Sequence, residues 1–277
     1  MTKKMTNETT LFESDPMVTD IFTGEDGDYF GLVLVANWPV SPLADMDGPY
    51  KKFLAAVKSC FRAKDVTPSD KNPASLPAVY LYPTMHLHIT LATLPRSTKI
   101  GSPPALPEDV QRAIKQKALE LVQAASRLPG WPKKPLRLVV DAAQIGTRAG
   151  ILLWNDLSGG VAAMRRCLEE ASTDDNGSSV TNIVDITIPT IVHSTFLRFA
   201  ELPLTPGEEV QAAFRSRGLG TPGKEFFCIG DGSDNDNSAQ PPLVLTANTV
   251  RLVSESIPYM HLPNDDKHVL WTNNLTK

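Results

Sequence analysis

The sequence predicts an α+β fold in which two lobes flank a cleft. Helical and strand patterns follow one another without strict alternation along the 277 residues, which favours α+β over a doubly wound α/β sheet. The chain also contains an imperfect internal duplication. Residues 83–91 and 189–197 both begin with Pro-Thr and continue into His-x-Thr, with one residue more between Pro-Thr and His in the first copy. Because equivalent strands of a duplicated fold meet about a pseudo-twofold axis, this repeat predicts the two lobes.

The first half of the chain is predicted to hold two strands and two helices. Residues 29–37 are apolar almost throughout and end at Trp38-Pro39, which indicates a buried strand. The apolar face of the helix that follows consists of Tyr50, Phe53, Leu54, Val57 and Phe61. A loop rich in Pro and Ser, 64–77, then leads into the first repeat, which is the second strand. The next helix begins at Pro107, and its apolar face consists of Val110, Ile114, Ala118, Leu121, Val122 and Ala125.

The second half is predicted to add a strand pair, two helices and closing strands. Residues 136–140 and 150–154 indicate paired strands. The helix after them has the apolar residues Leu157, Val161, Met164 and Leu168, and an acidic loop over 172–179 separates it from the second repeat. Thr205-Pro206-Gly207-Glu208 is typical of a capping box with Pro at the first helical position, and it predicts a helix that ends near Gly218. A polar loop over 218–242, with a short strand at 226–229, leads to closing strands at 243–253 and 268–271.

Composition indicates one globular unit that does not coat nucleic acid. The chain is 42% hydrophobic, enough for a substantial core, and we expect a single bilobal domain over 28–277 behind a disordered extension over 1–27. A formal net charge of −4 argues against a broad basic surface for DNA or long RNA. A small nucleotide or an RNA end is compatible with it. The oligomeric state is left open.

Cysteine usage and the N-terminal segment predict a cytoplasmic protein, with the nucleus as the alternative. Cys60, Cys167 and Cys228 are odd in number and lack CxxC spacing, which suits a reducing compartment. Residues 1–27 are polar and acidic, without the apolar core of a secretory signal or the Arg-rich pattern of a transit peptide. No apolar run approaches the ~20 residues that a membrane span needs, so no membrane partner is expected.

The two repeats suggest one site for acid–base chemistry. His88 and Thr90 lie two residues apart, as do His193 and Thr195, so in a strand each pair points to the same face, roughly 6.6 Å apart. Two strands facing each other would present two imidazoles, of which one can be neutral and the other protonated. That division suits displacement at phosphorus, where one imidazole removes a proton and the other donates one. The hydroxyls can donate to the non-bridging oxygens. The alternative is that both histidines are satisfied inside their strands.

The His-hydrophobic-Thr-hydrophobic pattern, present twice about a hundred residues apart, resembles the two-histidine (2H) phosphoesterase superfamily. This superfamily includes RNA 2′,3′-cyclic phosphodiesterases and 2′–5′ RNA ligase-like proteins. The first copy fits closely, whereas Ser194 replaces the usual hydrophobic residue in the second. The resemblance implies two antiparallel sheets that line a central cleft, with helices outside. It also implies catalysis by His88 and His193, substrate contacts by Thr90 and Thr195, a cyclic phosphate on a nucleotide or RNA end as substrate, and no metal or cofactor.

Several further residues near the repeats are candidates for substrate contact. His86 shares a face with His88 in a regular strand, and we expect it at the cleft rim, as a substrate contact or a bystander, with metal binding as the alternative. Tyr82 and Tyr259 could stack on a base, against the alternative of core packing. Arg198 follows His193 by five residues, as in many 2H proteins, but in a regular strand it faces the opposite side. A structural ion pair is therefore at least as well supported as phosphate binding.

Other polar clusters are interpreted as structural. The run 231–236 lacks the sixth-position Gly and twelfth-position Glu of a calcium loop. Arg165-Arg166 is expected on a solvated face, and His261 and His268 at the periphery. Two rival functions stay open: a 3′ exoribonuclease of the same superfamily that leaves a cyclic phosphate, and a non-catalytic nucleotide- or RNA-binding module.

Overall fold

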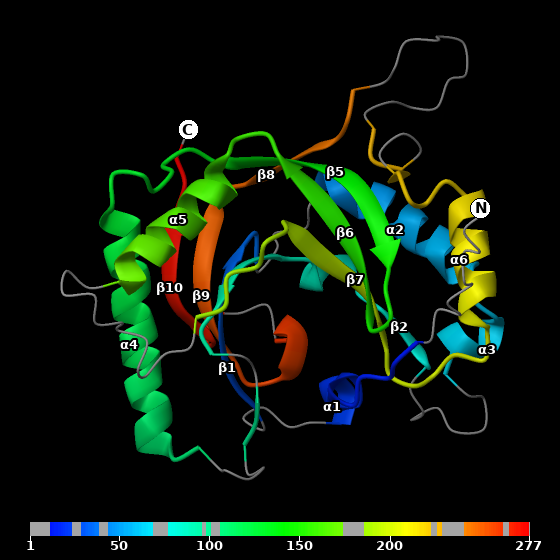
Figure 1. Ribbon diagram of the computed structural model, residues 1–277, viewed down its shortest axis with the longest axis horizontal. Coiled ribbons are helices and arrows are strands. Elements are labelled where there is room, and N and C mark those ends of the chain that lie inside the picture. The colour runs from blue at the N-terminus through cyan, green and yellow to red at the C-terminus, as the bar shows by residue number, and fades with distance from the viewer. Residues whose placement is uncertain are drawn as a thin grey trace, which may run out of the picture.

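The α+β prediction is confirmed by the computed structural model, which consists of two antiparallel sheets with helices packed outside them (Figure 1). The structure describes residues 12–23, 29–38, 44–68, 77–95, 98–100, 106–173, 186–222, 226–228, 241–262 and 266–276. None of the helices within these ranges is long and apolar enough to cross a membrane.

The first sheet has five strands in the order β10-β9-β1-β3, with β4 paired to β1. Its strands are β1 (Tyr29–Ala36), β3 (Ile89–Thr93), β4 (Thr98–Lys99), β9 (Thr249–Glu255) and β10 (Val269–Asn274). Every residue of β1 is buried, as expected for a central apolar strand. The motif strand β3 therefore lies at the end of this sheet's main path, next to β1.

The second sheet has five strands in the order β2-β7-β6-β5-β8. They are β2 (Val79–Leu81), β5 (Leu136–Ile145), β6 (Ala149–Asp156), β7 (His193–Phe199) and β8 (Val244–Ala247). Read from its far edge, the order β8-β5-β6-β7 matches β10-β9-β1-β3, and both motif strands occupy the fourth place. The strand order thus carries the predicted duplication, with β2 as an addition beside β7.

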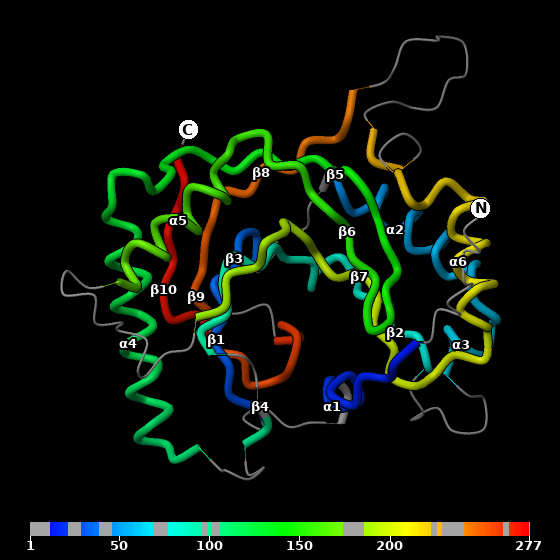
Figure 2. Tube along the Cα trace, viewed as in Figure 1, coloured from blue at the N-terminus to red at the C-terminus, as the bar shows by residue number. Residues whose placement is uncertain are grey.

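Most of the helices cover the outer sides of the two sheets, whereas α1 lies at the opening between them (Figures 1 and 2). They are α1 (Met17–Thr23), α2 (Ala44–Lys58), α3 (Ala63–Val66), α4 (Glu108–Arg127), α5 (Gly160–Ser172) and α6 (Gly207–Ser216), with 3₁₀ turns η1 (Thr84–His86) and η4 (Pro258–Met260). α2 precedes β3 in the chain yet packs on the other lobe, where Phe53 meets Phe196 of β7 with ring centroids 5.1 Å apart. α5 precedes β7 yet contacts β3. Each motif strand is therefore backed by a helix from the opposite half.

The segment 12–23 corrects the prediction that residues 1–27 are disordered. It contains α1, and Phe12 stacks on Phe199 at 4.3 Å between ring centroids. The backbone N–H of Asp15 donates to the Phe199 carbonyl at 2.7 Å. Because the segment is polar overall, the few residues that anchor it do not stand out in the sequence. They anchor it by contacts with β7, which is distant along the chain. The rest of 1–27 lies outside the described residues.

Three local features also differ from the predictions. The apolar run 243–253 divides at Asn248 into β8 and β9, which pair in different sheets. Leu157 is half exposed in a turn, and α5 begins only at Gly160. Thr205 does not cap α6; its hydroxyl donates to the buried carboxylate of Asp65 at 2.5 Å. An ionised acceptor makes the stronger hydrogen bond, so Asp65 holds the entry to α6.

Candidate active site

His88 and His193 line one pocket of about 530 Å³ between the two sheets. His88 directly precedes β3, and His193 is the first residue of β7. Thr90 and Thr195 line the same pocket. The other residues around it are Met17, Val33, Tyr82, Thr93, Thr187, Pro189, Arg198, Glu255, Tyr259 and Met260. The expectation that the two repeats meet at one cleft is therefore met by the structure.

A β-bulge in each motif strand determines which side chains reach the pocket. On β3, Thr90 and Ala92 pair with consecutive residues of β1, so Leu91 is the extra residue. On β7, Thr195 and Leu197 pair with consecutive residues of β6, so Phe196 is the extra residue. Each bulge follows its histidine by three positions, and an extra residue reverses the alternation of faces beyond it.

The bulge on β7 corrects the prediction for Arg198. In a regular strand this residue would point away from His193, but the reversal after Phe196 brings it into the pocket. Thr93 takes the equivalent place on β3. The two halves of the site thus share their imidazole and hydroxyl positions and differ at the fifth residue, where one half supplies a hydroxyl and the other a guanidinium.

The tautomer of His88 follows from its hydrogen bond. Its Nδ1 lies 2.8 Å from the backbone carbonyl of His86, and a carbonyl can only accept, so Nδ1 carries the proton. The neutral ring then keeps a lone pair on Nε2. Burial, followed by the charges of His193, His86 and Arg198, lowers the pKa of His88 to about 4, against the opposing effect of the His86 carbonyl. Near pH 7 the ligand-free His88 is neutral.

The second imidazole is in a similar environment. Burial lowers the pKa of His193 below its ordinary value, and the positive charges of Arg165 and Arg198 add to this effect, while the Ile191 backbone opposes it. No carboxylate is among the groups that raise the pKa of His88 or His193. An anionic ligand between the two rings would therefore be the natural source of that stabilisation.

Ser194, the residue that departs from the family pattern, joins the two motifs. Its hydroxyl donates to the backbone carbonyl of His88 at 2.6 Å and accepts from the indole nitrogen of Trp154 at 3.0 Å. Ser194 is buried on the face opposite His193. A hydrophobic residue there would leave the His88 carbonyl without this donor.

Arg165 corrects the prediction of a solvated face and is a residue that pattern reasoning missed. It is buried on α5 and donates through Nη2 to the carbonyls of Thr90 and Ile191, both at 3.0 Å. One guanidinium thereby bridges both motif segments from behind the pocket. The signal available in the sequence was the apolar periodicity of α5, on which Arg165 lies beside the buried Met164 and Leu168.

Tyr82 is fully buried, which agrees with the core-packing alternative and not with stacking on a base at the cleft mouth. Its ring packs near Tyr80, with centroids 5.2 Å apart. Only its hydroxyl end serves the pocket, where it accepts from Arg198 Nε at 3.2 Å. Burial raises the pKa of Tyr82 well above its ordinary value, so this group stays protonated.

The position of His86 agrees with the bystander alternative. His86 belongs to η1 and not to a strand, because the chain turns before β3 begins, and its ring packs on His261 with centroids 4.3 Å apart. Within the described chain it is not among the residues that line the pocket. His261, expected at the periphery, is partly buried, and its Nε2 lies 2.7 Å from the Tyr80 hydroxyl.

Glu255 is a buried acid in the pocket that no sequence pattern indicated. Burial raises its pKa to about 7, while the Met260 N–H, Arg198 and the Tyr259 backbone oppose that rise. The Met260 N–H donates to its carboxylate at 2.9 Å. Tyr259 and Met260 both have a left-handed backbone, with φ of 61° and 59°, a conformation that costs free energy in non-glycine residues. This turn brings the Met260 N–H to Glu255.

Metal ligands do not gather in the part of the chain that the structure describes. No group of three or more His, Cys, Asp or Glu side chains there is arranged to hold an ion. The run 231–236, interpreted above as a solvated loop, lies outside the described residues.

Comparison with known proteins returns structures but no sequence family. No family model matches the chain, and no curated protein matches it. E. coli LigT in complex with 3′-AMP is 12% identical, with 90% of this chain and 99% of LigT covered and a TM-score of 0.44. A structure described as a phosphoesterase is 15% identical over 90% and 99% of the chains, with a TM-score of 0.44. Kluyveromyces marxianus Usb1 with uridine monophosphate is 11% identical over 84% and 100%, with a TM-score of 0.38.

Identities of 11–15% and TM-scores of 0.38–0.44 do not assign an activity to this chain. Its chemistry has to be argued from its own pocket.

Proposed function

We propose that this protein is a 2H-type phosphodiesterase that hydrolyses a 2′,3′-cyclic phosphate, or a related phosphodiester, on a nucleotide or an RNA end. The observation that supports this most is the pair of imidazoles, each with a threonine two residues on, in one pocket between repeated strands. Two proton-transfer groups with hydroxyl donors beside them suit displacement at phosphorus. A purely binding module has no need for such a pair.

In the proposed mechanism, His88 is the general base and His193 the general acid. His88 holds its proton on Nδ1 and has a bare Nε2, so it can take a proton from the attacking water. The bond from phosphorus to the water oxygen forms as the bond to one ribose oxygen breaks, and protonated His193 gives its proton to that oxygen. Thr90 and Thr195 donate to the non-bridging oxygens. The product is a phosphomonoester.

Hydrolysis is expected to survive EDTA, because the two imidazoles supply both proton transfers without an ion. The test is incubation with 2′,3′-cyclic mononucleotides, 2′–5′ dinucleotides and 3′-ended oligoribonucleotides in EDTA, followed by product identification. Conversion of cyclic mononucleotides supports the proposal. Shortening of oligoribonucleotides with a cyclic phosphate left behind would favour the exoribonuclease, and binding without any product would favour the binding module. Activity lost in EDTA and restored by a divalent ion would contradict the metal-free mechanism.

The pH profile of kcat/KM is expected to be a bell centred on the acid side of ~6.5, the ordinary pKa of histidine. Burial lowers the pKa of both imidazoles, that of His88 to about 4. The base must be neutral, so activity falls as pH drops through the lower pKa. The acid must be charged, so activity falls as pH rises through the other. These two values belong to the coupled pair.

The profile of kcat is expected to lie at higher pH than that of kcat/KM, because a bound phosphodiester anion favours the charged imidazole. Initial rates measured from pH 4 to pH 9 on a cyclic mononucleotide give both profiles. A kcat/KM optimum above pH 7 would contradict the proposed electrostatics.

A further inference from the structure

The positive charge of the pocket is cancelled by a residue of the N-terminal segment. Arg198 is the one arginine or lysine among the described residues that line the pocket. Its Nη1 lies 3.0 Å from Oδ2 of Asp15, and the side chains are only 19% and 12% exposed. Both histidines are neutral near pH 7, so no other described lining residue offers a full positive charge.

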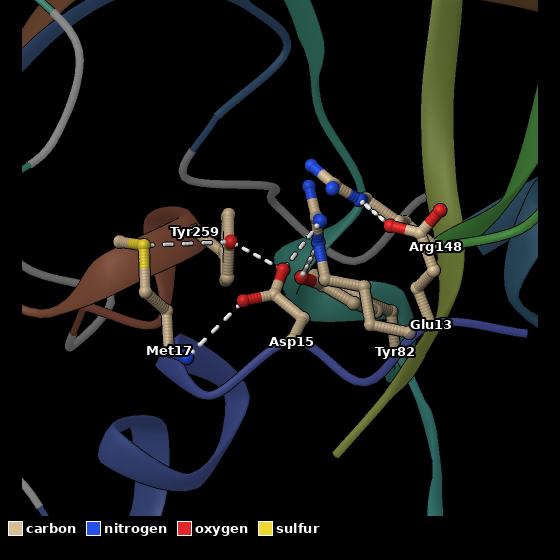
Figure 3. Close-up of polar contacts among 7 residues, drawn as sticks. Glu13, Asp15, Met17, Tyr82, Arg148 and Tyr259 are labelled. Atoms are coloured by element: carbon tan, nitrogen blue, oxygen red, sulfur yellow. Dashed lines mark hydrogen bonds and ion pairs between the residues drawn. The ribbon is translucent and has the colours of Figure 1, made fainter. Parts of the chain in front are cut away.

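Asp15 is held in this position by several donors (Figure 3). The Tyr259 hydroxyl donates to Oδ2 at 2.5 Å, and the Met17 backbone N–H donates to Oδ1 at 3.1 Å. Tyr259 also places its ring against Arg198, with the guanidinium carbon 3.7 Å from the ring centroid. The carboxylate is therefore held next to Arg198 and Tyr259, two residues that line the pocket.

This arrangement has a consequence for the charge of the ligand. A phosphodiester carries one negative charge, whereas a phosphomonoester carries close to two above its second pKa of about 6. Asp15 offsets Arg198, and Glu255 can add a second negative charge on the same side. A doubly charged ligand meets repulsion from a fixed carboxylate on each of its charges, and the free energy of that repulsion scales with ligand charge.

We propose that Asp15 is a specificity-determining residue: by neutralising Arg198, it makes the pocket favour singly charged phosphodiesters over doubly charged phosphomonoesters. This inference rests on the proposed hydrolysis, of which a phosphomonoester is the product. Asp15 thus weakens the binding of the doubly charged product more than that of the singly charged substrate.

The decisive variant is Asp15→Asn, which removes the charge and keeps one oxygen, able to accept from either the Tyr259 hydroxyl or the Met17 N–H. The probes are 2′-deoxyadenosine 3′-phosphate and its methyl ester, which differ by one charge and lack the 2′-hydroxyl needed for cyclisation. Dissociation constants are measured by calorimetry at pH 8 and low ionic strength, where the monoester is doubly charged.

The expected result is that D15N binds the methyl ester roughly threefold more tightly and the monoester about tenfold more tightly, because two charges experience about the square of the effect on one. The matched control is Glu13→Gln, which removes a charge from the same segment. Glu13 pairs with exposed Arg148 at 2.5 Å (Figure 3). E13Q is expected to change neither constant, and thermal melting checks that both variants are folded.

Equal gains for the two probes would overturn the inference, because they would mean that any phosphate displaces Asp15 from Arg198 at the same cost. Unchanged binding of both probes would overturn it as well. Failure of the unmodified protein to bind either probe, together with no turnover of cyclic nucleotides, would instead contradict the proposed function. The two failures are therefore distinguishable.

Discussion

Alanine in place of His88 or His193 is expected to lower turnover by ~10²- to 10⁴-fold, the usual contribution of a positioned acid or base. Both rings line the pocket, so neither loss can be replaced by another imidazole. The matched control is His86→Ala. Its ring lies against His261, and the variant keeps the backbone carbonyl that accepts from His88 Nδ1. H86A should therefore retain activity within a few-fold.

The double variant H88A/H193A should lose less than the product of the two single losses, because both groups act in one transition state. Steady-state rates on a cyclic mononucleotide, with circular dichroism to verify folding, provide the measurement. Two inert single variants, or losses that multiply fully, would contradict a shared site. A large loss in H86A would restore His86 as a functional residue.

Arg165→Met is expected to lower turnover by roughly 10²-fold without touching the substrate, since a displacement of reacting groups by about 1 Å has that effect. The guanidinium donates to the carbonyls of Thr90 and Ile191, and so it holds the two motif segments at a set distance. Methionine fills similar space but removes this donor from both carbonyls. That change should also reduce the free energy of unfolding by about 2–4 kcal/mol.

The control for Arg165 is its neighbour. Arg166 is exposed on the same helix, so Arg166→Met removes one positive charge without removing the bridge and should be nearly silent. Arg165→Lys retains the charge but not the planar two-carbonyl geometry, and it should recover stability more than turnover. Urea unfolding separates the two effects. An R165M protein with normal stability and normal turnover would show that the bridge has no positioning role.

The local elements of this fold were predictable because they depend on neighbours in the chain. The apolar stripe of α4 and the strand pair β5 and β6 follow from periodicity and turn residues that lie within a few positions. The two His-x-Thr motifs were also visible, because duplication leaves the same residues in the same order. The sequence alone therefore indicated the fold class, the two histidines and their threonines.

The composition of the pocket wall was decided by contacts between residues far apart in sequence. Arg198 reaches the pocket because a bulge at Phe196 reverses the faces of β7, and a bulge depends on the pairing of β7 with β6. Arg165 is buried because both motif segments present carbonyls to it. Asp15 is held beside the pocket by Arg198 and Tyr259, which lie more than 180 residues further along the chain.

The difference between the features that could be predicted from the sequence and those that could not has a physical cause. Periodicity and motif identity are set by covalent neighbours, so the strands, the helices and the two His-x-Thr motifs could be recognised from the amino-acid sequence. Strand register, the burial of a charged group and the pairing of charges depend on free-energy differences that exist only after the lobes have packed. The folded chain was needed to show that Arg198 faces the pocket, that Arg165 bridges the motifs and that Asp15 pairs with Arg198.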